Sequence, residues 1–151
     1  MIISGQNMMK SFKSVVLLVL AGTMLFMVSC NNPEKSEQTL DEGVEYYYHS
    51  EFNKALELFN QAVDEDADNF EAWFWIGNYY ENFRKHEKAI EAYNKAIQIN
   101  PRYADAFANR ALAKKRLGDK QGACADWHKA AELGKPNLDD NFKWCEGQGI
   151  K

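Results

Sequence analysis

The chain has 151 residues and a formal net charge of −4, with 22 acidic residues against 18 lysines and arginines. All 22 acidic residues but only 16 of the basic ones follow residue 29, so this part carries a net charge of −6. An acidic protein lacks the basic surface that binds nucleic acid, so we expect no nucleic-acid partner. The length predicts a single folded domain.

The first residues have the composition of a secretory signal peptide. Two lysines precede an uncharged apolar run over residues 15–28, which ends at Ser29 and Cys30. A basic start, a short apolar core and a small residue before the cleavage position are typical of such a leader. The run is shorter than the ~20 residues of a membrane-spanning helix, which disfavours an uncleaved anchor. We therefore expect residues 1–29 to be removed.

The sequence Met-Val-Ser-Cys over residues 27–30 resembles the lipobox of bacterial lipoproteins. The resemblance implies that Cys30 becomes the lipidated first residue of a mature protein in the bacterial cell envelope. It would lie on the outer membrane, on either the periplasmic or the surface side. Two acyl chains suffice for stable anchoring. Three methionines are candidate start positions: Met1, Met8 and Met9.

Residues 30–38 follow the lipobox and read as a tether. The segment is polar and has no apolar periodicity. Such composition is typical of a flexible connection, so we expect the folded part to start near residue 36.

The rest of the chain repeats every 34 residues. Small and aromatic residues keep their phase over residues 36–69, 70–103 and 104–137. A repeat of this length predicts stacked helix–turn–helix units, and so an all-α fold. We expect the small residues where two antiparallel helices cross closest, and the aromatic residues on the second helix, filling the gap to the next repeat. The phased positions are Gly43/Gly77/Ala111, Ala55/Ala89/Ala123, Phe59/Tyr93/Trp127 and Ala62/Ala96/Ala130.

The middle repeat has the clearest pattern. Apolar residues within 72–80 and within 88–97 recur at i, i+3, i+4 and i+7, and Asn100-Pro101 ends the second helix. These segments resemble the tetratricopeptide repeat family, and the resemblance covers about residues 36–137. It implies an α-solenoid with a concave groove lined by the first helix of each pair. Residues 138–151 would supply a short capping helix and a tail.

The family resemblance implies a binding groove for a protein or peptide partner. Rigid aromatics beside hydrogen-bonding side chains are typical of partner contacts, although Tyr47 and Phe74 fit equally well between neighbouring helices. The phases at which some members bind the terminal carboxylates of cytosolic chaperones carry no cationic clamp here; they hold Leu40, Val44, Trp75, Asp105 and Asn109. The candidate contact residues are Tyr47, Phe74, Asn78, Leu112 and Lys115.

Two cysteines remain once Cys30 is assigned to lipid. Cys124 and Cys145 form a disulfide or stay as two free thiols, and a bond would be chemically permitted outside the cytoplasm. His128 shares a helix face with Cys124, but two ligands at helical spacing are weak evidence for a metal site.

Motifs for phosphate binding or nucleophilic catalysis are missing from the sequence. We therefore expect no catalytic residues, no metal and no cofactor. The sequence predicts a membrane-anchored adaptor or scaffold. A structural assembly factor of an outer-membrane or pilus machine is the first alternative, and a regulatory subunit of an enzyme is the second. The oligomeric state stays open, because three repeats leave open ends.

Overall fold

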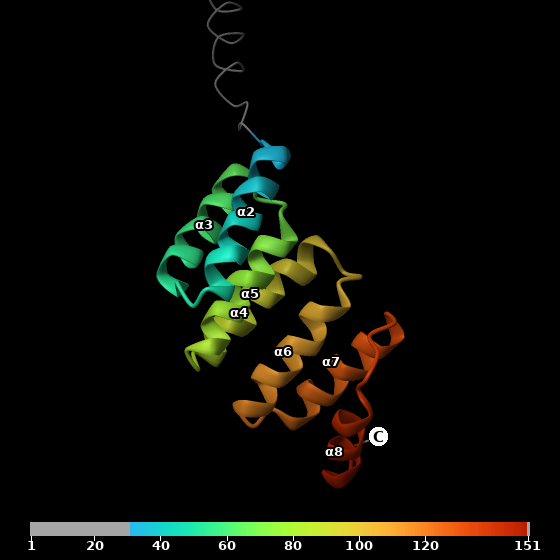
Figure 1. Ribbon diagram of the computed structural model, residues 1–151. Helices are drawn as coiled ribbons and strands as arrows, with labels where there is room; N and C mark the ends of the chain where they lie inside the picture. Colours follow the sequence, from blue (N-terminus) through green and yellow to red (C-terminus); the bar gives the residue numbers. More distant parts are fainter. Residues whose placement is uncertain (1–30, 151) are drawn as a thin grey trace, which may run out of the picture. The chain divides into compact units, whose positions relative to one another are not determined.

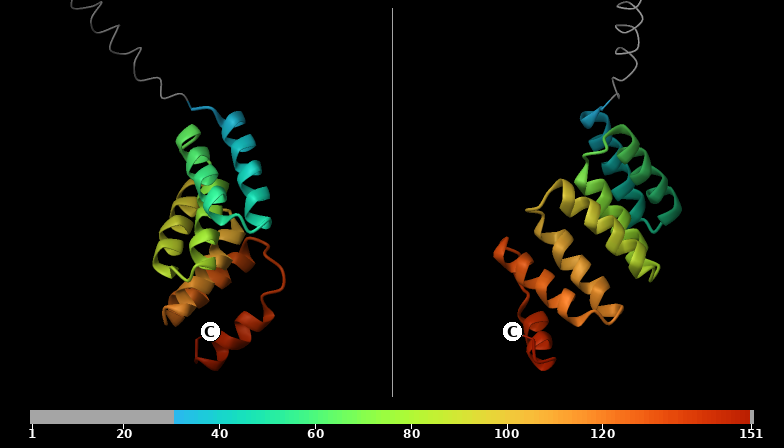
Figure 2. Two further views of the ribbon diagram at one scale, coloured as in Figure 1. Left: turned by 60° about the vertical axis from the view of Figure 1, so that its left-hand side comes forward. Right: turned by 180° about the vertical axis from the view of Figure 1, so that it is seen from behind.

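A computed structural model describes residues 31–150, and every described regular element is a helix. The helices stack in chain order, pair after pair, with a final short helix at the C-terminal end (Figures 1 and 2). This confirms the all-α solenoid. The helices are α2 (Pro33–Tyr48), α3 (Phe52–Glu65), α4 (Phe70–Asn82), α5 (His86–Ile99), α6 (Ala104–Arg116), α7 (Lys120–Glu132) and α8 (Asp139–Gly147).

The glycines of the repeat lie where an aromatic ring of the second helix fills the space. A Cβ atom at Gly77 would come within 2.4 Å of the Tyr93 ring, and one at Gly43 within 2.8 Å of the Phe59 ring. Both rings are fully buried, and the aromatic residue always follows the small one by 16 positions. The small residue therefore makes room for the ring that joins the two helices of a pair.

The turns follow the local chemistry that the third repeat predicts. Gly118 has a φ of +84° in the turn after α6, and the Asp119 side chain accepts a hydrogen bond of 2.9 Å from the Gly122 amide. Asn69 caps α4 in the same way, accepting 2.9 Å from the Ala72 amide. These caps satisfy amides that have no partner inside the helix.

The prediction of a flexible tether is wrong for residues 33–38, because α2 already begins at Pro33. Asn32 caps the helix, and proline is favoured in a first turn. The Ser36 hydroxyl is buried and donates 2.7 Å to the Ala62 carbonyl. Polar contacts to α3 therefore order a segment whose composition alone resembles a linker.

A buried ion network joins the second and third repeats. The Arg110 guanidinium makes two hydrogen bonds to the Asp126 carboxylate, 2.8 and 2.7 Å long, and a third of 2.6 Å to Asn94. Lys114 adds an ion pair of 2.9 Å to Asp126, whose residue surface is only 5% exposed. The network ties together α5, α6 and α7, and it satisfies charges that would be costly to bury alone.

The C-terminal helix closes the last repeat through a disulfide, as the sequence allowed. Cys124 on α7 and Cys145 on α8 are bonded and buried, and Trp144 packs edge-on against Trp127 at 5.6 Å. The Lys115 ammonium lies 4.5 Å from the centre of the Trp144 ring. This helix is the cap expected within residues 138–151.

The predicted leader over residues 1–29 and the lipidation at Cys30 lie outside the described residues, so both stay predictions. Within residues 31–150, each helix falls short of the length and apolarity that crossing a bilayer requires.

Candidate functional site

A groove of about 870 Å³ runs across the inner face of the helix stack. Its walls come mainly from α2, α4 and α6, the first helices of the three pairs, and from the turn between α4 and α5. The family resemblance implied this composition. The lining residues are Tyr47, Tyr48, Trp75, Asn78, Glu81, Asn82, Arg84, His86, Tyr93, Asn109, Leu112 and Arg116.

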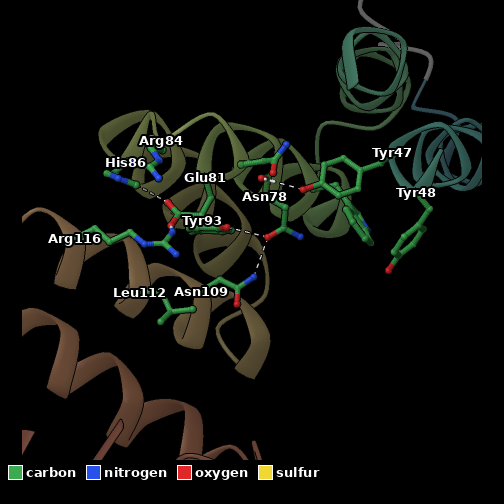
Figure 3. Close-up of a pocket in the computed structure, with 12 residues that line it drawn as sticks. Tyr47, Tyr48, Asn78, Glu81, Arg84, His86, Tyr93, Asn109, Leu112 and Arg116 are labelled. Atoms are coloured by element: carbon green, nitrogen blue, oxygen red, sulfur yellow. Dashed lines mark hydrogen bonds and ion pairs between the residues drawn. The ribbon is translucent and has the colours of Figure 1, made fainter. Parts of the chain in front are cut away.

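Asn78 lies at the middle of the groove and joins its walls by hydrogen bonds (Figure 3). Its side-chain oxygen accepts from the Tyr93 hydroxyl and from the Asn109 amide, both at 2.8 Å. Its backbone carbonyl accepts 3.3 Å from the Tyr47 hydroxyl. The N–H₂ group of the Asn78 amide makes no hydrogen bond to any of residues 31–150, so it can donate to a ligand.

Burial raises the pKa of two tyrosines of this network. The pKa of Tyr93 lies far above its ordinary value, with desolvation as the main cause, and desolvation also raises the pKa of Tyr47. Both phenols therefore stay protonated at neutral pH and act as fixed hydrogen-bond donors. Neither is suited to act as a general base.

One end of the groove is aromatic. The Tyr47 and Tyr48 rings lie 5.3 and 5.9 Å from the Trp75 ring, in edge-to-face arrangements. Tyr48 is 73% exposed, although its ring is large and partly apolar. Rings held by their neighbours lose little conformational freedom on binding, so this end suits an apolar or aromatic side chain of a partner.

The other end is charged. The Glu81 carboxylate forms an ion pair with Arg116 and lies 2.8 Å from the His86 ring nitrogen Nδ1. Figure 3 shows Arg84, His86 and Arg116 gathered around Glu81, with Tyr47 and Tyr48 at the far side of the groove. Glu81 is therefore neutralised from two sides, while Arg84 is available to a ligand.

Three of the five predicted contact residues line the groove: Tyr47, Asn78 and Leu112. Phe74 does not, because it is only 9% exposed and packs 5.0 Å from the Tyr103 ring and 5.9 Å from Tyr93. Lys115 does not line it either, since its ammonium lies over Trp144 of the cap. Of the two interpretations of Phe74, packing between helices is the one that its burial supports.

The sequence analysis missed the charged end, because Arg84, His86 and Arg116 lie in or beside turns. One spacing could have revealed the centre of the groove. Asn78 and Asn109 are 31 residues apart, which is one repeat less about one helical turn. Such a pair faces each other across neighbouring first helices, here at 2.8 Å.

The geometry suits recognition by hydrogen bonds, stacking and charge. Residues 31–150 bring together no group of three or more side chains that could hold a metal ion. Cys124, considered above as a metal ligand, is bonded to Cys145.

Comparison with known proteins agrees with this architecture. Residues 40–104 match the model of the tetratricopeptide repeat. The chain belongs to the tetratricopeptide repeat family. The match starts within α2 and ends at the beginning of α6. The periodicity and the helix pairs extend this tetratricopeptide architecture to α7.

Similar proteins carry tetratricopeptide units inside longer chains. The RNA polymerase II-associated protein 3 of Xenopus tropicalis is 29% identical over 106 residues, which cover 70% of this chain but 16% of that protein. The first such unit of Spaghetti (RPAP3), solved with an HSP90 peptide, superposes with a TM-score of 0.75 at 19% identity, covering 79% of this chain and 96% of that one. MamA gives a TM-score of 0.62 at 28% identity, with 65% and 57% covered.

Proposed function

We propose that this chain is a non-enzymatic adaptor that holds a protein or peptide partner in the groove around Asn78. The observation that carries the proposal is an open groove with hydrogen-bonding groups at its centre and exposed apolar side chains at its walls. Tyr48 is 73% exposed and Leu112 is 37% exposed. Exposed apolar groups beside polar ones are typical of partner-binding surfaces. A tetratricopeptide unit similar in fold has been solved with an HSP90 peptide, which supports this use of the fold.

The anchoring half of the proposal rests on the leader and the lipobox-like residues 27–30. A lipidated Cys30 would be followed almost directly by α2, which begins at Pro33. The groove would then be held close to a membrane surface of the bacterial envelope, and a partner bound there would be concentrated at that surface.

The test of the groove is affinity capture after cross-linking in cells. The groove variant carries Tyr48→Ala and Leu112→Ala, and both side chains are exposed enough that their loss should leave the fold intact. The matched control is Leu117→Ala, because Leu117 is 43% exposed and is not a lining residue of the groove. We expect a partner that wild type and control capture and that the groove variant loses. Unchanged capture by the folded groove variant would reject the groove as the binding site.

The test of the anchor is membrane fractionation with metabolic labelling by a fatty-acid analogue. We expect label on the wild-type protein and in the membrane fraction, and neither for Cys30→Ser. A soluble, unlabelled wild-type protein would refute the lipid anchor while leaving the groove proposal untouched.

A further inference from the structure

The backbone at Arg84 adopts a conformation that favours glycine. In all three repeats the residue two positions after the first helix has a positive φ: +64° at Ser50, +55° at Arg84 and +84° at Gly118. These positions are 34 residues apart. Only glycine takes this conformation without a steric cost, as it does in the third repeat. An arginine kept at such a position is a local conflict of the kind that is expected at functional sites.

The Arg84 side chain lines the groove and is available to a ligand. No carboxylate among residues 31–150 forms an ion pair with it, and the residue is exposed. The nearest acidic group in the groove wall, Glu81, is already paired with Arg116 and His86. The Arg84 charge is therefore not used to hold the helices together.

Charge is unevenly distributed along the stack, which gives the groove a direction. Residues 31–69 contain 11 acidic and two basic residues, whereas residues 70–150 contain 11 acidic and 13 basic ones. An anionic group on a ligand would be repelled from the first repeat, where Tyr48 lies, and attracted to the end that carries Arg84 and Arg116. The aromatic end instead offers stacking to an uncharged side chain.

We propose that Arg84 binds the carboxylate of an acidic side chain in the partner segment, while an aromatic or apolar residue of the same segment packs on Tyr48 and Trp75. The inference rests on the proposed function, because it specifies the chemistry of the groove's ligand. A guanidinium suits this role because it presents paired donors to a carboxylate.

The probes are short peptides with acetylated N-termini and amidated C-termini, so that no terminal carboxylate is present. Each contains one phenylalanine and one glutamate, separated by glycine–serine spacers of different length. Matched peptides carry glutamine or lysine in place of glutamate. Binding to the folded domain is followed by fluorescence anisotropy of a dye on the peptide. We expect the best glutamate peptide to bind about tenfold more tightly than its glutamine counterpart, and the lysine peptide to bind weakest.

The key variant is Arg84→Gly, which removes the side chain and relieves the backbone conflict. Its thermal midpoint should equal or exceed that of the wild type, while its affinity for the glutamate peptide falls about tenfold to the level of the glutamine peptide. Ser50→Gly is the matched control, because it relieves the same conflict in the first repeat outside the groove lining. It should raise the midpoint similarly and leave binding unchanged. Arg84→Lys keeps the charge and should restore part of the affinity.

Equal binding of the glutamate and glutamine peptides to the wild type would overturn the role of Arg84. Full affinity of Arg84→Gly, or no binding by any peptide of the panel, would overturn it as well. The adaptor proposal fails on a different result, namely unchanged partner capture by the variant that lacks Tyr48 and Leu112. The two failures can therefore be told apart.

Discussion

Removing the Cys124–Cys145 disulfide should destabilise the domain and release its C-terminal helix. The bond joins residues separated by 21 positions along the chain. In the chain-entropy model, opening a loop of this length costs about 3 kcal/mol of unfolding free energy. For a domain of this size that corresponds to a fall in the thermal midpoint of roughly 10 °C.

The assay compares oxidised wild type, reduced wild type and the double variant Cys124→Ala/Cys145→Ala in thermal unfolding by circular dichroism. Reduced wild type keeps both sulfur atoms, so its difference from the oxidised form measures the cross-link alone. The double variant also loses buried atoms, because both side chains are at most 1% exposed, and so should unfold at a lower temperature still. Reductant should have no effect on the variant.

Tryptophan fluorescence supplies the second readout. Trp144 on α8 lies 5.6 Å from Trp127 and beneath the Lys115 ammonium. When the bond is reduced, α8 should separate from α7 at temperatures below the main transition, and Trp144 should then emit at longer wavelength. The reasoning is refuted if reduction lowers the midpoint by less than about 2 °C and leaves the emission unchanged, since the cap would then be held without the bond.

Two further predictions concern single positions. Gly77→Ala should destabilise the domain by about 1 kcal/mol in urea unfolding, because the clash with the buried Tyr93 ring outweighs the gain in helix propensity of about 1 kcal/mol. Gly43→Ala should cost less, since its closest approach is 2.8 Å against 2.4 Å, and a stabilised Gly77→Ala would contradict the packing argument. Burial raises the pKa of Glu65, but hydrogen bonds from three neighbouring side chains outweigh it and lower the pKa to about 2 from a model value of 4.5. The stability that Glu65 contributes is therefore present above pH 4.5 and lost as the pH falls toward 2, so Glu65→Gln should flatten this acid dependence. Glu57→Gln serves as the exposed control, and equal acid profiles for wild type and Glu65→Gln would rule the effect out.

The repeat predicted the core because its positions are determined inside each helix pair. Gly77 and Tyr93 belong to one pair and are 16 residues apart, so the same contact recurs wherever the sequence repeats. A local pattern is then enough to identify both the fold and the buried face.

The start of the fold was harder to predict, because long-range polar contacts determine it. The Thr39 hydroxyl donates 2.7 Å to the Glu65 carboxylate, and the Lys35 ammonium lies 2.7 Å from the same group. These partners are 26 to 30 positions apart, so composition within residues 30–38 carried no sign of them. A local signal did exist: Asn32 followed by Pro33 is a helix start that a search for caps could have found.

The groove shows how neighbours decide the role of equivalent positions. The phase of Leu40, Phe74 and Ala108 is buried in every repeat. The phases four and seven residues later reach the groove in the second repeat, at Asn78 and Glu81. Its third-repeat equivalents, Leu112 and Lys115, then diverge.

Leu112 stays in the groove, whereas Lys115 lies over Trp144 of the cap. The middle repeat alone has a neighbour on both sides that leaves its first helix open to the groove. Its side chains can therefore be specialised for binding, while the same phases at the C-terminal end are used for closing the core. This explains why Asn78, Glu81 and Arg84, all from the second repeat, supply the centre and the charged end of the candidate site.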